Sequence, residues 1–122
     1  MREILFRGKR VDNGEWIVSK DVMHETIRGK LCLSRPHEDW YAVDPDTLGE
    51  CTGLRDKNGT PIFEGDICSI DDKSGIVKYD ESEARFFVEF DLYIRVFSDD
   101  IDISEVEVIG NIYDNPRLLS TT

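Results

Sequence analysis

The side chains that could bind a metal ion are few and widely spaced. His24 and His37 lie thirteen positions apart, and Cys32, Cys51 and Cys68 form no close pair. Zinc sites take their ligands from close pairs, and an odd number of cysteines does not make a disulfide framework. We therefore expect no metal site and no bound cofactor, and we interpret the cysteines as small buried side chains.

The carboxylates, hydroxyls and glycines form no catalytic pattern either. The acidic stretch 100–105 lacks the glycine that a calcium-binding loop needs. No serine lies in a Gly-x-Ser-x-Gly elbow, and neither histidine has a marked partner for nucleophilic catalysis. The glycine-containing stretch 53–59 lacks the Gly-Lys-Ser/Thr of a phosphate-binding loop. The sequence therefore predicts a protein without catalytic residues, which is not an enzyme.

Charge is distributed unevenly along the 122 residues. Up to Thr60 there are 10 Lys/Arg and 11 Asp/Glu, whereas from Pro61 onward there are 5 and 15. Such an acidic half repels phosphate, because nucleic-acid affinity depends mainly on cations that displace counterions. We expect an acidic surface that keeps the protein soluble. The alternative is an acidic face that imitates DNA and inhibits a host nucleic-acid-binding protein.

The cations near the N-terminus are the one candidate nucleic-acid patch. On a strand, Arg7 and Lys9 share one face, while Arg2 and Arg10 lie on the other. This arrangement divides the patch. An accessory nucleic-acid-binding role therefore ranks last among the hypotheses, and we expect no nucleic-acid partner.

Short strands separated by turn residues predict a mainly β fold with at most short helical turns. In the first half, Asp12-Asn13-Gly14 favours a tight hairpin turn, because Asn and Gly both tolerate positive φ. A second hairpin is predicted around Arg28-Gly29, and Asp44-Pro45 favours the start of a short helical turn. The predicted strands of this half are Glu3–Lys9, Glu15–Ser19, Asp21–Ile27, Lys30–Ser34 and Trp40–Val43.

The second half predicts five strands at intervals of about ten residues, which is typical of a small barrel or sandwich. They are Ile67–Ile70, Ile76–Tyr79, Arg85–Phe90, Leu92–Phe97 and Val106–Ile109. A Gly-Asp before a buried strand, followed by Gly-Ile-Val, resembles the opening of SH3-like barrels. We therefore expect an N-terminal β-hairpin region, 1–55, packed on a C-terminal SH3-like barrel with a tail, 56–122, as two parts of one compact unit.

The aromatic residues are the better indication of a partner. Phe86 and Phe87 are neighbours on a strand and face opposite sides, so at least one must leave the barrel interior. It packs under the N-terminal half or forms a contact between copies, since aromatic residues are enriched in interface cores. The predicted interface residues are Trp16, Trp40, Tyr41, Phe86 and Phe87.

Three stretches carry a family resemblance. The chain opens with M-R-E-I-L-F-R-G-K-R, continues at 52–67 with T-G-L-R-D-K-N-G-T-P-I-F-E-G-D-I, and closes with V-I-G-N-I-Y-D-N-P-R-L-L. In this order they resemble the YopX family of bacteriophage and prophage proteins over nearly the whole chain. The resemblance implies small, mainly β proteins with no established activity and no catalytic residues to carry over.

Turns and packing best explain the matching residues of the central motif, which are Gly53, Leu54, Asp56, Asn58, Gly59, Ile62, Gly65 and Asp66. The segment between Asp21 and Trp40 varies in the family and is a candidate for specificity. The longest apolar runs are too short to cross a membrane, and charge interrupts the N-terminus, so we expect a cytoplasmic protein. We expect a non-catalytic interaction or assembly module that forms homo-oligomers or binds an unidentified host or phage protein.

Overall fold

The structure is a computed structural model that describes residues 4–25, 30–34, 39–98 and 100–119. Contacts divide the chain into two compact units, Met1–Cys51 (unit 1) and Thr52–Thr122 (unit 2). This division falls inside one strand, β6 (Gly49–Arg55), whereas the predicted boundary lies at the end of that strand. Among the described residues, no helix is long and apolar enough to span a membrane.

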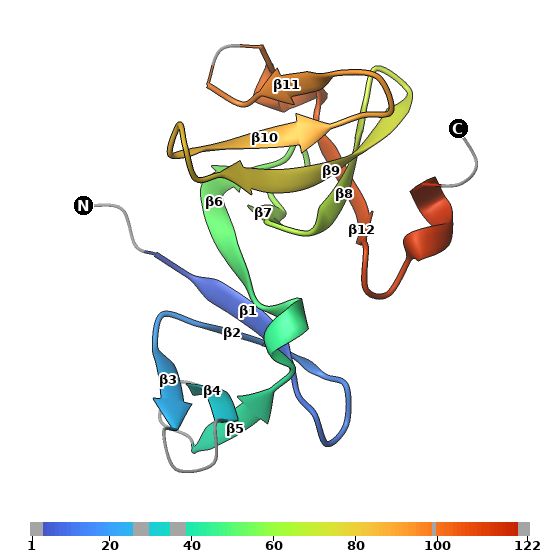
Figure 1. Cartoon of the computed structure of the whole chain (residues 1–122). Coiled ribbons are helices and arrows are strands. Elements are labelled where there is room, and N and C mark those ends of the chain that lie inside the picture. The colour runs from blue at the N-terminus through green and yellow to red at the C-terminus, as the bar shows by residue number, and fades with distance from the viewer. Residues whose placement is uncertain (1–3, 26–29, 35–38, 99, 120–122) are drawn as a thin grey trace. The chain divides into compact units, whose positions relative to one another are not determined.

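Unit 1 is built from short antiparallel strands, shown in blue and cyan in Figure 1. β1 lies between β2 and the start of β6, and β4 lies between β3 and β5. Asp44 caps the short 3₁₀ helix η1 with its side chain, and Pro45 opens the helix, as predicted. The bounds are β1 (Phe6–Lys9), β2 (Trp16–Ser19), β3 (Val22–Glu25), β4 (Lys30–Ser34), β5 (Trp40–Val43) and η1 (Pro45–Thr47).

The first hairpin is confirmed, but its turn is longer than the predicted tight turn Asp12-Asn13-Gly14. Gly14 has φ +74°, whereas Asn13 is not among the residues with positive φ. Backbone bonds from Arg10 N to Glu15 O and from Gly14 N to Arg10 O instead close a longer turn, 10–15. The second hairpin, β3–β4, is also confirmed, although its predicted turn at Arg28-Gly29 lies outside the described residues.

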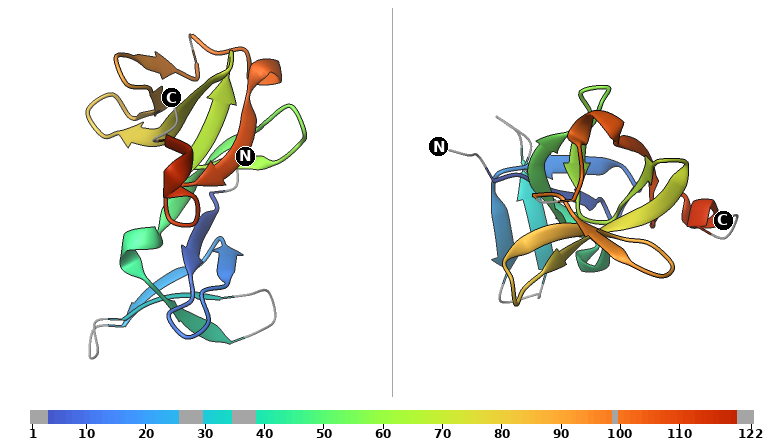
Figure 2. Two further views of the ribbon diagram at one scale, coloured as in Figure 1. Left: turned by 90° about the vertical axis from the view of Figure 1, so that its right-hand side faces the viewer. Right: turned by 90° about the horizontal axis from the view of Figure 1, so that it is seen from above.

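Unit 2 contains a five-stranded antiparallel sheet in the order β11-β10-β9-β8-β12. Figure 2 shows its strands twisting strongly. The five predicted strands correspond to β8 to β12, although β11 begins at Ile94 rather than at Leu92, and β7 was not predicted. Outside this sheet, β7 pairs beside β6. The bounds are β7 (Pro61–Phe63), β8 (Asp66–Ile70), β9 (Lys73–Asp80), β10 (Arg85–Glu89), β11 (Ile94–Val96), η2 (Ile103–Glu105), β12 (Glu107–Asn111) and η3 (Pro116–Leu119).

Each unit has its own apolar core. The fully buried side chains Ile17, Leu33 and Val43 form the core of unit 1. In unit 2, one cluster collects buried residues from β7 to the residue before β12, namely Ile62, Cys68, Ile70, Val77, Val88, Phe90, Phe97 and Val106. The predicted closed barrel is not confirmed, because β11 and β12 end the hydrogen-bonded order without pairing to each other among the described strands.

The turn between β8 and β9 holds two consecutive aspartates in the left-handed region. Asp71 has φ +52° and Asp72 has φ +64°, and the flanking residues Ile70 and Lys73 pair directly. This is the geometry of a type I′ hairpin turn, which favours Asn-Gly because most L-residues are strained at positive φ. The strands are therefore joined by a tight turn with an unfavourable sequence.

Replacing one aspartate of this turn should stabilise the protein. We expect Asp72→Gly to raise the free energy of unfolding by about 0.5 kcal/mol, because glycine adopts φ > 0 without strain. Glu81→Gly is the control: Glu81 is an exposed turn residue that is not among those with positive φ. This control should lower stability slightly. Urea unfolding followed by circular dichroism measures both, and a lower midpoint for Asp72→Gly would contradict the prediction.

Candidate functional site

The residues of the central motif all lie in unit 2, half of them at turns and half in strands. Gly53 and Gly59 adopt φ +84° and +82°, Asn58 lies in the exposed 56–60 turn, and Ile62 is fully buried in the core. Leu54 differs from the packing role expected for it, because 38% of its surface is exposed. The motif residues with the most specific contacts are two buried acids and one glycine.

Asp56 is a buried carboxylate that joins the motif to β12. One of its oxygens, Oδ1, accepts the N–H groups of Asn58 at 2.9 Å and Thr60 at 2.8 Å. The other, Oδ2, accepts the N–H of Val108 at 2.8 Å, from 52 positions along the chain. Burial alone would raise the pKa of Asp56, but these three backbone donors and the nearby Lys57 outweigh it and lower the pKa. Asp56 is therefore held as an anion for structural reasons.

Gly65 and Asp66 make the corresponding connection at the start of β8. The Asp66 side chain is buried and accepts the N–H of Phe63 at 2.7 Å. Gly65 has φ +91°, and a Cβ added there would lie 3.0 Å from the Tyr113 ring. Ile112 donates its N–H to the Gly65 carbonyl. The central motif thus packs on the closing motif of the same chain.

The two end strands of the five-stranded sheet carry hydrogen-bonded caps. On β12, Val108 donates to Asp56, and the Lys57 N–H donates to the Val106 carbonyl at 2.9 Å. On β11, the Val96 N–H donates to Asp100 Oδ2 at 3.0 Å, and the Asp100 N–H donates to the Val96 carbonyl at 2.8 Å. These hydrogen bonds occupy backbone N–H and C=O groups with which an added strand would otherwise pair. Contact through these edges is therefore disfavoured.

The basic residues near the N-terminus are divided as predicted. The Arg7 guanidinium lies 4.7 Å from the Trp16 ring centre and the Lys9 Nζ lies 5.6 Å from it, so both are on one face. Arg10 lies on the other face, over the Tyr41 ring that packs on the core. Arg2 lies outside the described residues. The described cations of this set, Arg7, Lys9 and Arg10, thus do not make a single basic surface.

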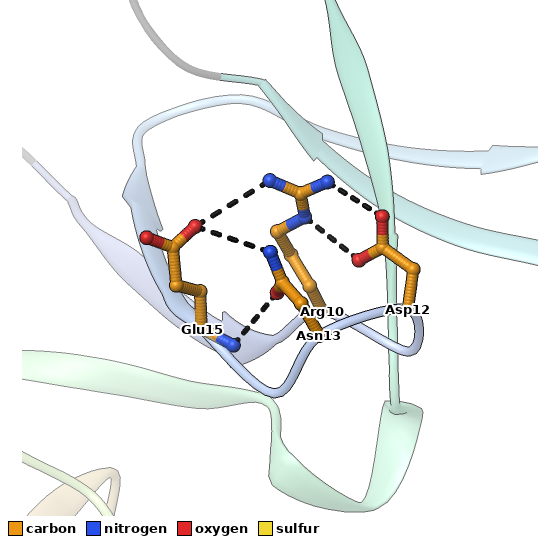
Figure 3. A network of polar contacts seen from close by, with 4 residues as sticks. All are labelled: Arg10, Asp12, Asn13 and Glu15. Atoms are coloured by element: carbon orange, nitrogen blue, oxygen red, sulfur yellow. Dashed lines mark hydrogen bonds and ion pairs between the residues drawn. The ribbon is translucent and has the colours of Figure 1, made fainter.

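Arg10 is enclosed by acids of its own turn, as Figure 3 shows. Its guanidinium donates twice to Asp12, at 2.9 and 2.6 Å, and once to Glu15 at 3.4 Å. The hydrogen bond and charge of Asp12 raise the pKa of Arg10, and the same contact lowers the pKa of Asp12. The Asn13 side chain donates to the Glu15 carboxylate and accepts the backbone N–H of Glu15. This turn therefore presents a paired charge rather than a cation for phosphate.

The predicted interface aromatics are divided between the units. In unit 1, Trp16 and Tyr41 are half-buried, and Trp40 is 43% exposed. In unit 2, Phe86 packs on the core and meets Tyr79 edge-to-face at 4.9 Å, whereas Phe87 is half-buried and pairs with Lys78. Within each unit these residues do not gather into one exposed cluster.

The most exposed apolar side chains of unit 2 lie instead at the β10–β11 turn. The Phe90 N–H donates to the Tyr93 carbonyl at 2.9 Å, so the link is a tight turn with Asp91 and Leu92 at its tip. Leu92 is 94% exposed, Tyr93 43% and Ile94 50%. We call Leu92, Tyr93 and Ile94 the turn patch. A contiguous set of exposed apolar side chains is typical of an interaction surface.

Two hollows border the turn patch. One, of about 430 Å³, continues along β9 and β10 past Ile76 and Glu89 to Leu119. The other, of about 510 Å³, is lined by Asp72 of the β8–β9 turn and by Lys73 and Ser74 at the start of β9. Phe90 to Tyr93 line both. The Tyr93 ring stacks on the Phe90 ring with 4.9 Å between the ring centres. This stacking holds the aromatic side chains that line both hollows.

The charged groups around the turn patch are unevenly paired. Glu89 pairs with Lys78 at 2.8 Å and Asp71 pairs with Arg95 at 3.4 Å. Asp72 and Asp91 make no hydrogen bond or ion pair with any residue that the structure describes. Both line the 510 Å³ hollow, together with Lys73, whose Nζ lies 5.5 Å from the centre of the Tyr93 ring. The hollow therefore has a carboxylate excess.

Sequence reasoning missed the turn patch, although a signal for it was present. The predicted strands ending at Phe90 and starting at Leu92 leave one residue for the turn, whereas a tight hairpin turn needs two. Leu92 therefore had to lie at a turn tip, where an apolar side chain has little to pack against.

For metal ions, no group of three His, Cys, Asp or Glu suited to hold one is found in the described part of the chain. All three cysteines are buried as free thiols.

Comparison with known proteins supports the family resemblance that the three sequence stretches indicate. Among curated proteins, none matches the chain significantly. A family model described as YopX protein matches residues 5–120, which include the motif around Asp56, Gly65 and Asp66 and its contacts with β12. The predicted resemblance is confirmed, and the chain belongs to the YopX family.

Proposed function

We propose that this protein is a non-catalytic protein-interaction module that binds its partner through the turn patch. The observation that carries the proposal is Leu92, an apolar side chain that is 94% exposed and is followed in the chain by the exposed Tyr93 and Ile94. Removing such a cluster from water favours association, and aromatic residues are enriched in interface cores. The hydrogen-bonded caps on β11 and β12 support contact by side chains rather than by an added strand.

The finer features of the proposal concern fold and origin. We propose that unit 2 is a half-open SH3-like arrangement, and what supports it is the single core cluster that spans β7 to Val106. We further propose a phage or prophage protein that acts in the bacterial cytoplasm, in line with the character of the family. A non-catalytic role agrees with the buried acid Asp56, whose oxygens are both taken by backbone donors.

Site-specific photo-crosslinking in living bacteria tests the function. With p-benzoyl-phenylalanine at position 92, we expect a discrete protein adduct, because this side chain would lie inside the interface. The same group at position 81, an exposed turn residue away from the patch, is the matched control and should give none. An adduct of twice the chain mass would identify a second copy as the partner. No adduct at position 92, or equal adducts at both positions, would refute the proposal.

The second candidate function is an acidic inhibitor of a nucleic-acid-binding protein. Unit 2 carries 7 Lys/Arg against 16 Asp/Glu, a net charge of −9, which favours this candidate. Electrostatic complementarity of this kind accelerates and selects the binding of a basic partner. An adduct from position 92 that proves to be a DNA- or RNA-binding protein would support it, and an acidic partner would exclude it.

A further inference from the structure

We propose that the 510 Å³ hollow beside the turn patch is a binding site for an arginine side chain of a basic polypeptide. The proposal rests on the proposed function and names the chemistry of the partner. An apolar neighbour of that arginine would cover Leu92 and Ile94, and the guanidinium would enter the hollow between Asp72 and Asp91.

The first argument is the charge of the walls. Asp72 and Asp91 line the same hollow, and neither makes a hydrogen bond or ion pair with a described residue. The neighbouring acids Asp71 and Glu89 already have Arg95 and Lys78. Two carboxylates in one concave site attract a cation, and a guanidinium can donate to both at once because its five N–H groups point in different directions.

The second argument is the aromatic floor. Tyr93 is held by stacking on Phe90, and the Lys73 Nζ lies 5.5 Å from the Tyr93 ring centre. The chain thus already places one of its own cations over this ring. Arginine binds aromatic faces better than lysine does, because its guanidinium is planar and less strongly hydrated. An incoming arginine could therefore displace the Lys73 ammonium from the ring, because Lys73 is exposed and its side chain is flexible.

The third argument concerns which partner fits. A second copy of unit 2 would bring two net charges of −9 together, and like charges across an interface are unfavourable. A basic segment that carries an apolar residue matches both parts of the surface, the acidic hollow and the turn patch. Charge complementarity thus selects a basic polypeptide over a second copy.

Peptide binding to the full chain tests this inference. The probe is a fluorescein-labelled peptide of alternating arginine and leucine, and a peptide with glutamate in place of arginine is its control. By fluorescence anisotropy at low salt, we expect the arginine peptide to bind and the glutamate peptide not to bind. Asp72→Asn/Asp91→Asn should weaken binding about tenfold, since two charged contacts are lost. Asparagine also tolerates positive φ, so the β8–β9 turn is kept.

A second double variant, with the same change in net charge, shows whether binding depends on the acids of the hollow or on the overall negative charge of unit 2. Glu81→Gln/Glu83→Gln removes two exposed acids of another turn and should weaken binding no more than about twofold. Lys73→Gln removes the internal competitor and should strengthen binding about threefold. Leu92→Ser should weaken binding even at high salt, because an apolar contact is not screened.

The outcomes are distinguishable. Equal weakening by the two double variants, or no gain from Lys73→Gln, would overturn the arginine site, even if position 92 gives an adduct in cells and the interaction module stands. An adduct at position 92 that contains only a second copy would also overturn it. No adduct at all would remove the proposed function and the inference with it.

Discussion

Asp56→Ala should lower the free energy of unfolding of unit 2 by about 4 kcal/mol. The change removes the buried Asp56 carboxylate and leaves the N–H groups of Asn58, Thr60 and Val108 without their acceptor in a partly buried place. Hydrogen bonds to a charged group contribute about 1.5–3 kcal/mol each, and unpaired buried donors add a desolvation penalty. Urea unfolding followed by far-UV circular dichroism measures the loss.

The effect of Asp56→Ala should also depend on pH. The pKa of Asp56 is lower in the folded protein than its ordinary value of 3.8. A carboxyl group of this kind stabilises the fold above its unfolded pKa, and the contribution disappears as the pH falls through the folded pKa. The difference between wild type and variant should therefore be constant above about pH 5 and shrink below 3.8. A difference that grows on acidification would contradict this assignment.

An exposed aspartate provides the matched control. Asp80 accepts the backbone N–H and the hydroxyl of Ser82 with one oxygen, but it lies on the surface, where water can replace it. Asp80→Ala should therefore cost far less than Asp56→Ala. Both tryptophans, Trp16 and Trp40, lie in unit 1, so fluorescence reports on that unit while circular dichroism reports on both. A fluorescence midpoint that moves with Asp56→Ala would show that the units unfold together.

Gly75→Ala should be the second severe change, with a loss of about 3 kcal/mol. Gly75 lies in β9 opposite Cys68, and a Cβ added there would lie 2.5 Å from Val88 Cγ1 and 2.9 Å from the Glu89 carbonyl oxygen. Cores packed at crystal-like density cannot absorb an extra methyl group without moving side chains or backbone. Thermal unfolding of the purified variant measures the effect.

Two further variants identify overpacking as the cause. Gly59→Ala places a methyl group in open space at φ +82°, so it should cost only the backbone strain, about 1 kcal/mol. Val88→Ala removes the atom nearest to the new Cβ, so Gly75→Ala/Val88→Ala should cost less than the sum of the two single changes. Additive costs would mean that Val88 is not the obstacle.

Local sequence features predicted much of the fold, because turn residues act over a few positions. Asp44-Pro45 predicted the start of η1, and the apolar strands of unit 2 lie where alternation and turn residues indicated. Asp12-Asn13-Gly14 indicated the place of the first hairpin turn but not its length, because Arg10 binds Asp12 and Glu15 across a longer turn. The barrel could not be derived, since closure depends on the two edge strands, which Asp56 caps from 52 positions away and Asp100 caps from the segment that follows β11.

The candidate site was harder to predict for a related reason. Leu92 reads as a strand residue beside Tyr93 and Ile94, and its exposure follows from the exact position of a turn, the least reliable feature of a sequence interpretation. The hollow combines residues of two turns, 71–72 and 91–92, which are twenty positions apart. Phe86 and Phe87 were the more visible signal, yet both are half-buried.

The strand β6 belongs to both units, with 49–51 in one and 52–55 in the other. A genetic exchange at this boundary would cut a strand rather than a linker, and each product would have to supply the missing half from a foreign sequence. Domains that recombine freely are usually joined by exposed linkers with few contacts. The two units should therefore be inherited together rather than exchanged at this boundary.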